Sequence, residues 1–113
     1  MTWEEARQRT LDQWRRVGAL ATARDIKGFA HAVNTCTPLC EKAQDEAERE
    51  GLGEDSRCYF CLRLSPRSEC RRIFSDLIVT ALDGDWTAVQ QQVDVVVKDL
   101  EAMRVPEEPA AAQ

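Results

Sequence analysis

Five cysteines gather in the middle of the chain, and their thiols offer more chemistry than any other residue type in it. Cys36 and Cys40 bound the stretch "CTPLC", Cys58 and Cys61 bound "CYFC", and Cys70 follows in "SEC". Cysteines separated by two or three residues can direct two thiolates at one ion. The question is therefore whether these thiols bind a metal, form disulfides, react, or simply pack.

Structural zinc is the favoured interpretation of the two pairs. Their spacing is C-x3-C-x17-C-x2-C, and the long spacer can fold back as a hairpin that brings the pairs together. Four thiolates arranged tetrahedrally, with sulfur about 2.3 Å from the metal, are the usual ligands of a closed zinc site. We expect Cys36, Cys40, Cys58 and Cys61 to be the ligands, with Cys70 as the substitute. Zinc would stabilise this segment, because the free energy of metal binding becomes folding free energy.

An iron–sulfur cluster is the main alternative, because thiolates also hold such clusters. Cys40, Cys58, Cys61 and Cys70 have the outline C-x17-C-x2-C-x8-C. This outline resembles that of the WhiB-like iron–sulfur regulators, small helical proteins with a C-x2-C flanked by two further cysteines. The last gap is longer here, and the sequence lacks that family's glycine-rich tryptophan turn and basic tail. The resemblance implies a cluster on these four thiolates.

Disulfides, reactive thiols and plain packing are the remaining alternatives. The nested pairing Cys36–Cys61 and Cys40–Cys58 would staple a helical hairpin, and it is similar to the twin C-x3-C hairpins of small mitochondrial translocase chaperones. A reducing compartment disfavours that pairing. Helix N-termini and nearby arginines favour thiolates, so Cys40 or Cys70 could instead be redox-active. Cys70 also shares a helical face with the apolar residues that follow it, so by itself it is best interpreted as a core thiol.

The composition predicts a single folded domain with an acidic net charge. Among 113 residues, 43% are hydrophobic, which is enough for one core. A net charge of −5 disfavours nucleic acid as a partner. The amino terminus is charged from residue 4 and lacks the apolar run of a signal peptide, and no apolar run approaches the roughly 18 residues of a membrane span. We therefore expect a cytoplasmic protein without a nucleic-acid or membrane partner.

Helical periodicity runs along the chain, and local signals predict where the first helices begin. Thr2 and Glu5 form a capping box at the start of the first helix. Asp25 is a plausible N-cap for the second helix. Pro38 either kinks this second helix or opens a new one with Thr37 as its N-cap.

The second half of the chain repeats these signals. Residues 41–50 have almost no apolar face and are expected to project into solvent. Ser65 and Pro66 predict the next helix start, and Gly84 and Asp85 predict a turn followed by another N-cap. The expected inward-facing residues of these two helices are Ile73, Phe74, Leu77, Ile78, Ala81, Leu82, Trp86, Val89, Val93, Val96, Leu100 and Met103.

Four amphipathic helices with mostly short connections predict an all-α fold, an antiparallel four-helix bundle with a cysteine-rich connection between the second and third helices. We expect one helical domain over residues 1–105 and a disordered C-terminal tail over residues 106–113. The stems "TARDIKGFAHAV" and "ALDGDWTAVQQQV" look alike. Internal duplication would explain this, although chance similarity between two helix starts is the favoured interpretation.

Patterns typical of catalysis are sparse. His31 is the single histidine, it lies about 140° round a helix from Cys36, and the sequence has no glycine-rich phosphate loop. The arginines at 7, 9, 15, 16, 24, 67, 71 and 72 are expected mostly on solvated helix faces, although they could form a local basic patch. We therefore expect a non-enzymatic accessory or regulatory protein that binds zinc and acts through protein–protein interaction. The alternative is a redox-active protein with an iron–sulfur cluster or a reactive cysteine pair, and the sequence specifies neither the partner nor the oligomeric state.

Overall fold

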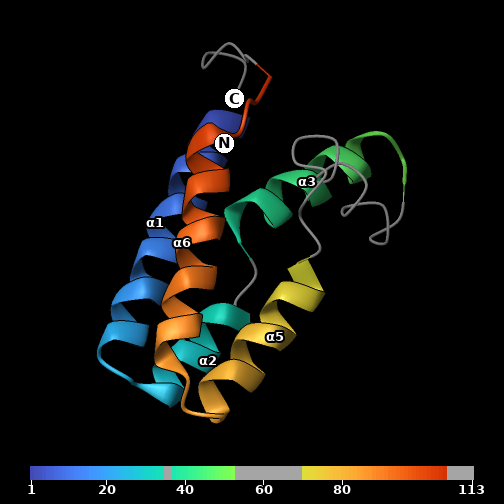
Figure 1. Ribbon diagram of the computed structural model, residues 1–113. Coiled ribbons are helices and arrows are strands. Elements are labelled where there is room, and N and C mark those ends of the chain that lie inside the picture. Colours follow the sequence, from blue (N-terminus) through green and yellow to red (C-terminus); the bar gives the residue numbers. More distant parts are fainter. Residues whose placement is uncertain (35–36, 53–69, 107–113) are drawn as a thin grey trace.

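The computed structural model describes residues 1–34, 37–52 and 70–106, with the side chains of residues 70–72 left aside, and this part of the chain is helical (Figure 1). The helices are α1 (Trp3–Thr22), α2 (Ile26–Asn34), α3 (Pro38–Arg49), α5 (Cys70–Leu82) and α6 (Trp86–Ala102). The predicted all-α helical bundle is confirmed. A separate α3 exists because Thr37 caps a new helix at Pro38, which was one of the two alternatives left open by the sequence.

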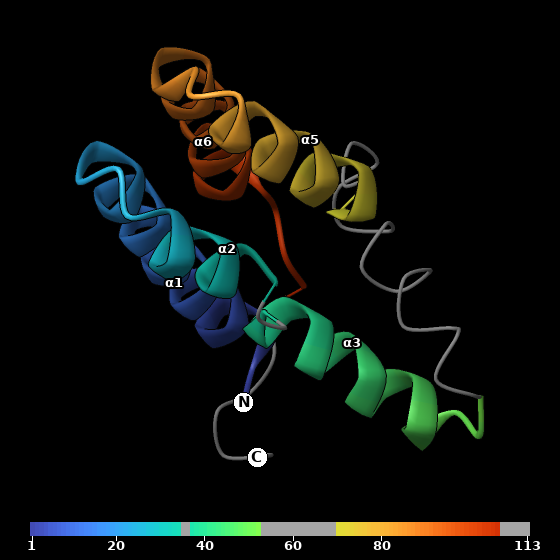
Figure 2. The same cartoon turned by 90° about the horizontal axis from the view of Figure 1, so that it is seen from below.

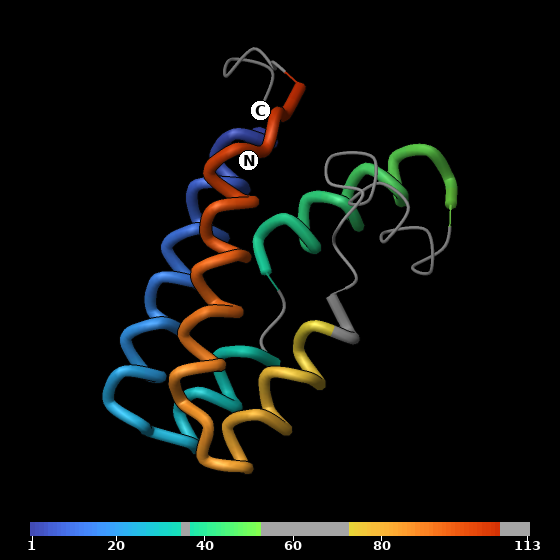
Figure 3. The backbone as a smooth tube through the Cα atoms, in the orientation of Figure 1, coloured from blue at the N-terminus to red at the C-terminus, as the bar shows by residue number. Residues whose placement is uncertain are grey.

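The longest helices, α1 and α6, form an antiparallel pair. Arg7 near the start of α1 donates to the Leu100 carbonyl near the end of α6, at 3.0 Å. Gln90 near the start of α6 donates to the Gly18 carbonyl near the end of α1, at 3.1 Å. Figure 3 shows the same arrangement in the chain path, with the beginning of α1 and the end of α6 at one end of the molecule.

Two helical hairpins, α1–α2 and α5–α6, make up the bundle. In addition to packing within each hairpin, α1 packs on α6 and α2 packs on α5. If α1 is exchanged with α5 and α2 with α6, the same four helix pairs are in contact. This is the pattern that an approximate two-fold axis between the hairpins produces. Seen from below, the two hairpins lie side by side and α3 extends beyond them (Figure 2).

The hairpins are equivalent in detail when residues whose numbers differ by 60 are compared. In each turn a residue with positive φ precedes an aspartate: Arg24 with φ 55° and Gly84 with φ 80°. Each aspartate then accepts a backbone N–H three residues on, Asp25 at 3.0 Å and Asp85 at 3.1 Å. The two stems that look alike in sequence therefore also share their turn conformation and their caps. This similarity goes beyond what two similar helix starts alone would produce.

The core lies along the axis between the hairpins. Predicted inward positions such as Leu77 and Val93 are buried, and so are Trp14 and Phe29 of the first hairpin. Leu82 was also predicted to face inward, but it is 69% exposed. The prediction fails there because α5 ends at Leu82 and the chain turns away, so no neighbouring helix covers this side chain.

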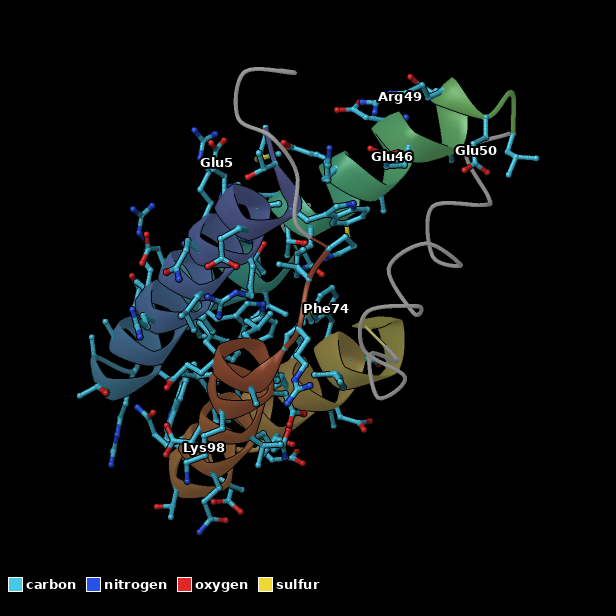
Figure 4. All side chains as sticks on the ribbon, turned by 90° about the horizontal axis from the view of Figure 1, so that it is seen from above. Glu5, Glu46, Arg49, Glu50, Phe74 and Lys98 are labelled. Carbon is cyan, nitrogen blue, oxygen red and sulfur yellow. The ribbon has the colours of Figure 1, made fainter. Side chains whose placement is uncertain are left out.

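Helix α3 leaves the bundle and packs closely on α1 alone among the described helices. The expectation that residues 41–50 lack a buried face is wrong, because Ala43 and Ala47 are fully buried. Small side chains at these positions let the two backbones approach. Charged side chains, including Arg49 and Glu50, occupy the end of α3 away from the bundle (Figure 4).

The described helices include none that is both long and apolar enough to cross a membrane.

Candidate functional site

Cys40 is the predicted ligand that the structure describes with its side chain. It lies in the first turn of α3, where Thr37 Oγ1 accepts the Cys40 backbone N–H at 3.2 Å. The thiol is not in a disulfide and the residue is half-buried. A half-buried cysteine whose backbone is fixed at a capped helix start can serve as one thiolate ligand of a metal.

The entry of α3 is fixed to α1 by a buried hydroxyl. Leu39 donates its backbone N–H to Thr10 Oγ1 at 3.1 Å, and the same hydroxyl donates to the Ala6 carbonyl at 2.8 Å. Thr10 is 2% exposed, so these hydrogen bonds are shielded from water. Cys40 follows Leu39 directly, and its position relative to α1 is therefore well defined.

The other predicted ligands fall largely outside the described residues. Cys36 lies in 35–36, and Cys58 and Cys61 lie in 53–69. Cys70 begins α5, and only its backbone is described. Within 1–34, 37–52 and 70–106 there is no cluster of three or more potential metal ligands. The four-thiolate zinc site and its substitute ligand remain predictions.

Lys42, two residues after Cys40, is a buried cation that the sequence did not predict. Its side chain is 3% exposed and its ammonium lies 3.1 Å from Glu46 Oε1. The same ammonium lies 5.6 Å from the centroid of the Trp3 ring. A cation between a carboxylate and an aromatic face is compensated on both sides, so it can be buried at the α1–α3 contact. The i,i+4 spacing of Lys42 and Glu46 was visible in the sequence. The contact of the Lys42 ammonium with the Trp3 ring was not.

Near the start of α1, Arg7 joins this helix to the end of α6. Its guanidinium bonds to the Glu4 carboxylate at 2.6 Å and to the Leu100 carbonyl at 3.0 Å. The hydrogen bond from Arg7 lowers the pKa of Glu4, and the bond to Glu4 raises the pKa of Arg7. Glu4 is exposed, so water screens this pair. A groove of about 670 Å³ adjoins it, but Arg7 is already engaged by Glu4 and by the backbone of α6.

A second groove, of about 570 Å³, lies between α1 and α2. We call it the basic groove, because its exposed lining includes Arg9, Arg16 and His31 beside the half-buried Leu20 and Ala32. His31 is exposed there. The spacing of Arg9 and Arg16 on one helix face was a signal for this surface, but the groove itself exists only once α2 has packed on α1.

Comparison with known proteins gives no assignment: no family model, no curated protein and no solved structure matches this chain. Its function must be argued from its own residues.

Proposed function

We propose that this is a non-enzymatic, metal-binding helical protein that acts through protein–protein interaction. The proposed metal is zinc, the proposed ligands are Cys36, Cys40, Cys58 and Cys61, and Cys70 is the substitute. The observation that carries the proposal is the place of Cys40, half-buried in the capped first turn of α3. A reducing compartment such as the cytoplasm would keep these thiols available as ligands.

The attachment of α3 explains what a metal would add. Among the described helices α3 packs closely only on α1, through a short row of buried residues. A closed thiolate site that includes Cys40 would tie the start of α3 to the segment that follows this helix. Structural zinc acts in this way, since its binding free energy adds to the free energy of folding.

Exposed apolar side chains support the interaction half of the proposal. Four large hydrophobic residues in the described part of the chain have substantial exposure: Leu52 at 44%, Val79 at 55%, Leu82 at 69% and Val95 at 58%. Val79 and Leu82 are neighbours on α5. Exposed apolar side chains that lie together are typical of contact surfaces, whereas scattered ones are ordinary.

Metal analysis tests the proposal directly. The protein is purified without chelator, its visible spectrum is recorded, and zinc and iron are measured by mass spectrometry. We expect a colourless protein with about one zinc per chain, as a four-thiolate site predicts. Because Cys70 is the substitute ligand, Cys36→Ser, Cys40→Ser, Cys58→Ser and Cys61→Ser are each combined with Cys70→Ser, and each combination should lower the zinc content. Cys70→Ser alone is the matched control and should leave the zinc content unchanged.

Three results would contradict the proposal. A brown protein with iron and sulfide would favour the iron–sulfur alternative. Metal-free protein whose thiols react only after reduction would favour disulfides or a redox pair. Metal-free protein with five reactive thiols would leave the cysteines as packing residues.

A further inference from the structure

Two exposed arginines, Arg9 and Arg16, line the basic groove. Ion pairs engage Arg7, Arg15 and Lys42 with acidic residues on their own helices. Arg9 and Arg16 make no ion pair within the described residues, although both are exposed at the same groove. Asp12 also lines this groove, but it lies 3.8 Å from Arg15.

One equivalent position of the second hairpin carries the opposite charge, and another is neutral. Adding 60 to each residue number places Asp76 where the first hairpin has Arg16, and Gln91 where it has His31. Because the two hairpins share their turn conformation and caps, the fold does not require cations at this groove. The basic charge is a property of this one surface.

A surface on α5 complements the basic groove. This α5 surface consists of Asp76, Val79, Leu82 and Asp83, all of which are exposed. Asp83 lies just beyond α5, but its backbone N–H still donates to the Val79 carbonyl, so the helical path continues to it. Asp76 and Asp83 are seven residues apart, which places them on one face about 10.5 Å from each other.

The charges of the two surfaces match in spacing as well as in sign. Arg9 and Arg16 are also seven residues apart on one face of their helix. Beside these charges the groove offers Leu20 and Ala32, and the α5 surface offers Val79 and Leu82. Each surface therefore combines two charges, two helical turns apart, with adjacent apolar side chains.

We propose that the basic groove of one molecule binds the α5 surface of a second copy of this chain. In this contact Arg9 and Arg16 pair with Asp76 and Asp83, and Val79 and Leu82 cover the apolar part of the groove. The two surfaces differ and lie on different hairpins, so each molecule can bind two neighbours. Such a head-to-tail contact adds molecules one after another until a ring closes or an open chain forms.

This proposal rests on the proposed protein–protein interaction and names its partner. It does not depend on the proposed zinc site. The zinc content tests the proposed zinc site, and the oligomeric state tests the proposed contact between copies of the chain. Every variant below is therefore checked for helical content by circular dichroism and for metal content before its oligomeric state is compared.

Sedimentation velocity over a protein concentration series, at low and at high salt, is the measurement. We expect association that increases with concentration and weakens as the salt concentration rises from about 50 to about 500 mM, because exposed charges are screened. The charge reversal Arg9→Glu/Arg16→Glu should weaken association at least about tenfold, and so should Asp76→Arg/Asp83→Arg. Lys98→Glu/Arg104→Glu changes the net charge by the same amount as the first variant and lies outside both surfaces, so it should leave association unchanged.

Mixing the two reversed variants separates a contact from a folding defect. Each variant alone has like charges on both surfaces, but an equimolar mixture again offers opposite charges between molecules. We expect the mixture to associate as the original chain does. A protein that stays monomeric at low salt at every concentration would overturn the proposal, even if an acidic helical peptide bound to the groove. A control variant weakened as much as the reversed variants, or a mixture that fails to associate, would overturn it as well.

Discussion

Lys42 shows how a single residue can be predicted as solvated and yet be buried. Its helix is rich in charge, and Glu41, Asp45 and Glu48 on the same helix are exposed. Lys42 lies instead toward α1, where Trp3 provides an aromatic face for its ammonium. The residue therefore contributes both a packed four-carbon stem and a compensated charge to the α1–α3 contact.

The first prediction separates these two contributions. Lys42→Met keeps most of the stem, whereas Lys42→Ala removes it and leaves a void beside Trp3. We expect the alanine variant to lose about 2 kcal/mol more unfolding free energy than the methionine variant, because about three buried groups are lost. Urea denaturation followed by circular dichroism measures the difference.

Arg49→Ala is the matched control for this comparison. Arg49 also pairs with Glu46, at 3.1 Å, but its side chain is 66% exposed. We expect its removal to change the unfolding free energy by no more than about 0.5 kcal/mol. Equal losses for Lys42→Met and Lys42→Ala would show that the stem does not pack as described.

The two hairpin turns allow a comparison between elements of the same molecule. Both turns require a residue with positive φ, a conformation that is unfavourable for side chains other than glycine. The second turn has Gly84 at this position, and the first has Arg24. The first turn is therefore strained at a place where the second is not.

The second prediction is that reciprocal substitutions shift stability in opposite directions. Arg24→Gly should raise the unfolding free energy by about 0.5 to 1 kcal/mol, and Gly84→Ala should lower it by about 1 kcal/mol or more. Thermal unfolding measures both changes. Arg24→Ala removes the same charge without relieving the strain, so a stabilisation of similar size in that variant would refute the conformational explanation.

The success of sequence-based prediction depended on how local each signal is. Asp85 after Gly84 was predicted as an N-cap, and the cap of Thr37 with Pro38 was one of two alternatives, because capping involves residues within one turn. The exposure of Leu82 was missed because periodicity alone does not show where a neighbouring helix stops covering a face. The basic groove was missed because it needs α1 and α2 packed together. For the thiols, the spacing predicts pairs, whereas the closing of a four-ligand site depends on the path of residues 53–69, outside the described residues.

At the scale of the whole molecule, an aromatic contact joins the two hairpins. Trp14 of α1 and Phe74 of α5 hold equivalent positions, and their ring centroids lie 5.7 Å apart at an interplanar angle of 30°. Equivalent residues meet only near an axis that relates the two halves. A second contact, between Phe29 and Trp86, joins α2 to α6 at the same centroid distance of 5.7 Å.

The third prediction is that Trp14 and Phe74 are energetically coupled. A double-mutant cycle of Trp14→Leu and Phe74→Leu should give a coupling free energy of about 0.5 to 1.5 kcal/mol, measured by urea denaturation. The combination of Trp14→Leu with Trp86→Leu takes one ring from each contact, and we expect its effects to add within about 0.5 kcal/mol. Additive effects for Trp14 and Phe74 would show that the hairpins do not depend on this contact.

The pairing of α1 with α6 also bears on how the protein is made. Arg7 and Leu100, which meet across this pair, are separated by 93 residues in the chain. During synthesis the amino-terminal helix emerges first, and contacts between distant residues form late. The α1–α2 hairpin can close while the ribosome is still at work, but the apolar side of α1 that α6 will cover stays open until α6 has emerged. That side of α1 is therefore the surface that a chaperone would meet on the nascent chain.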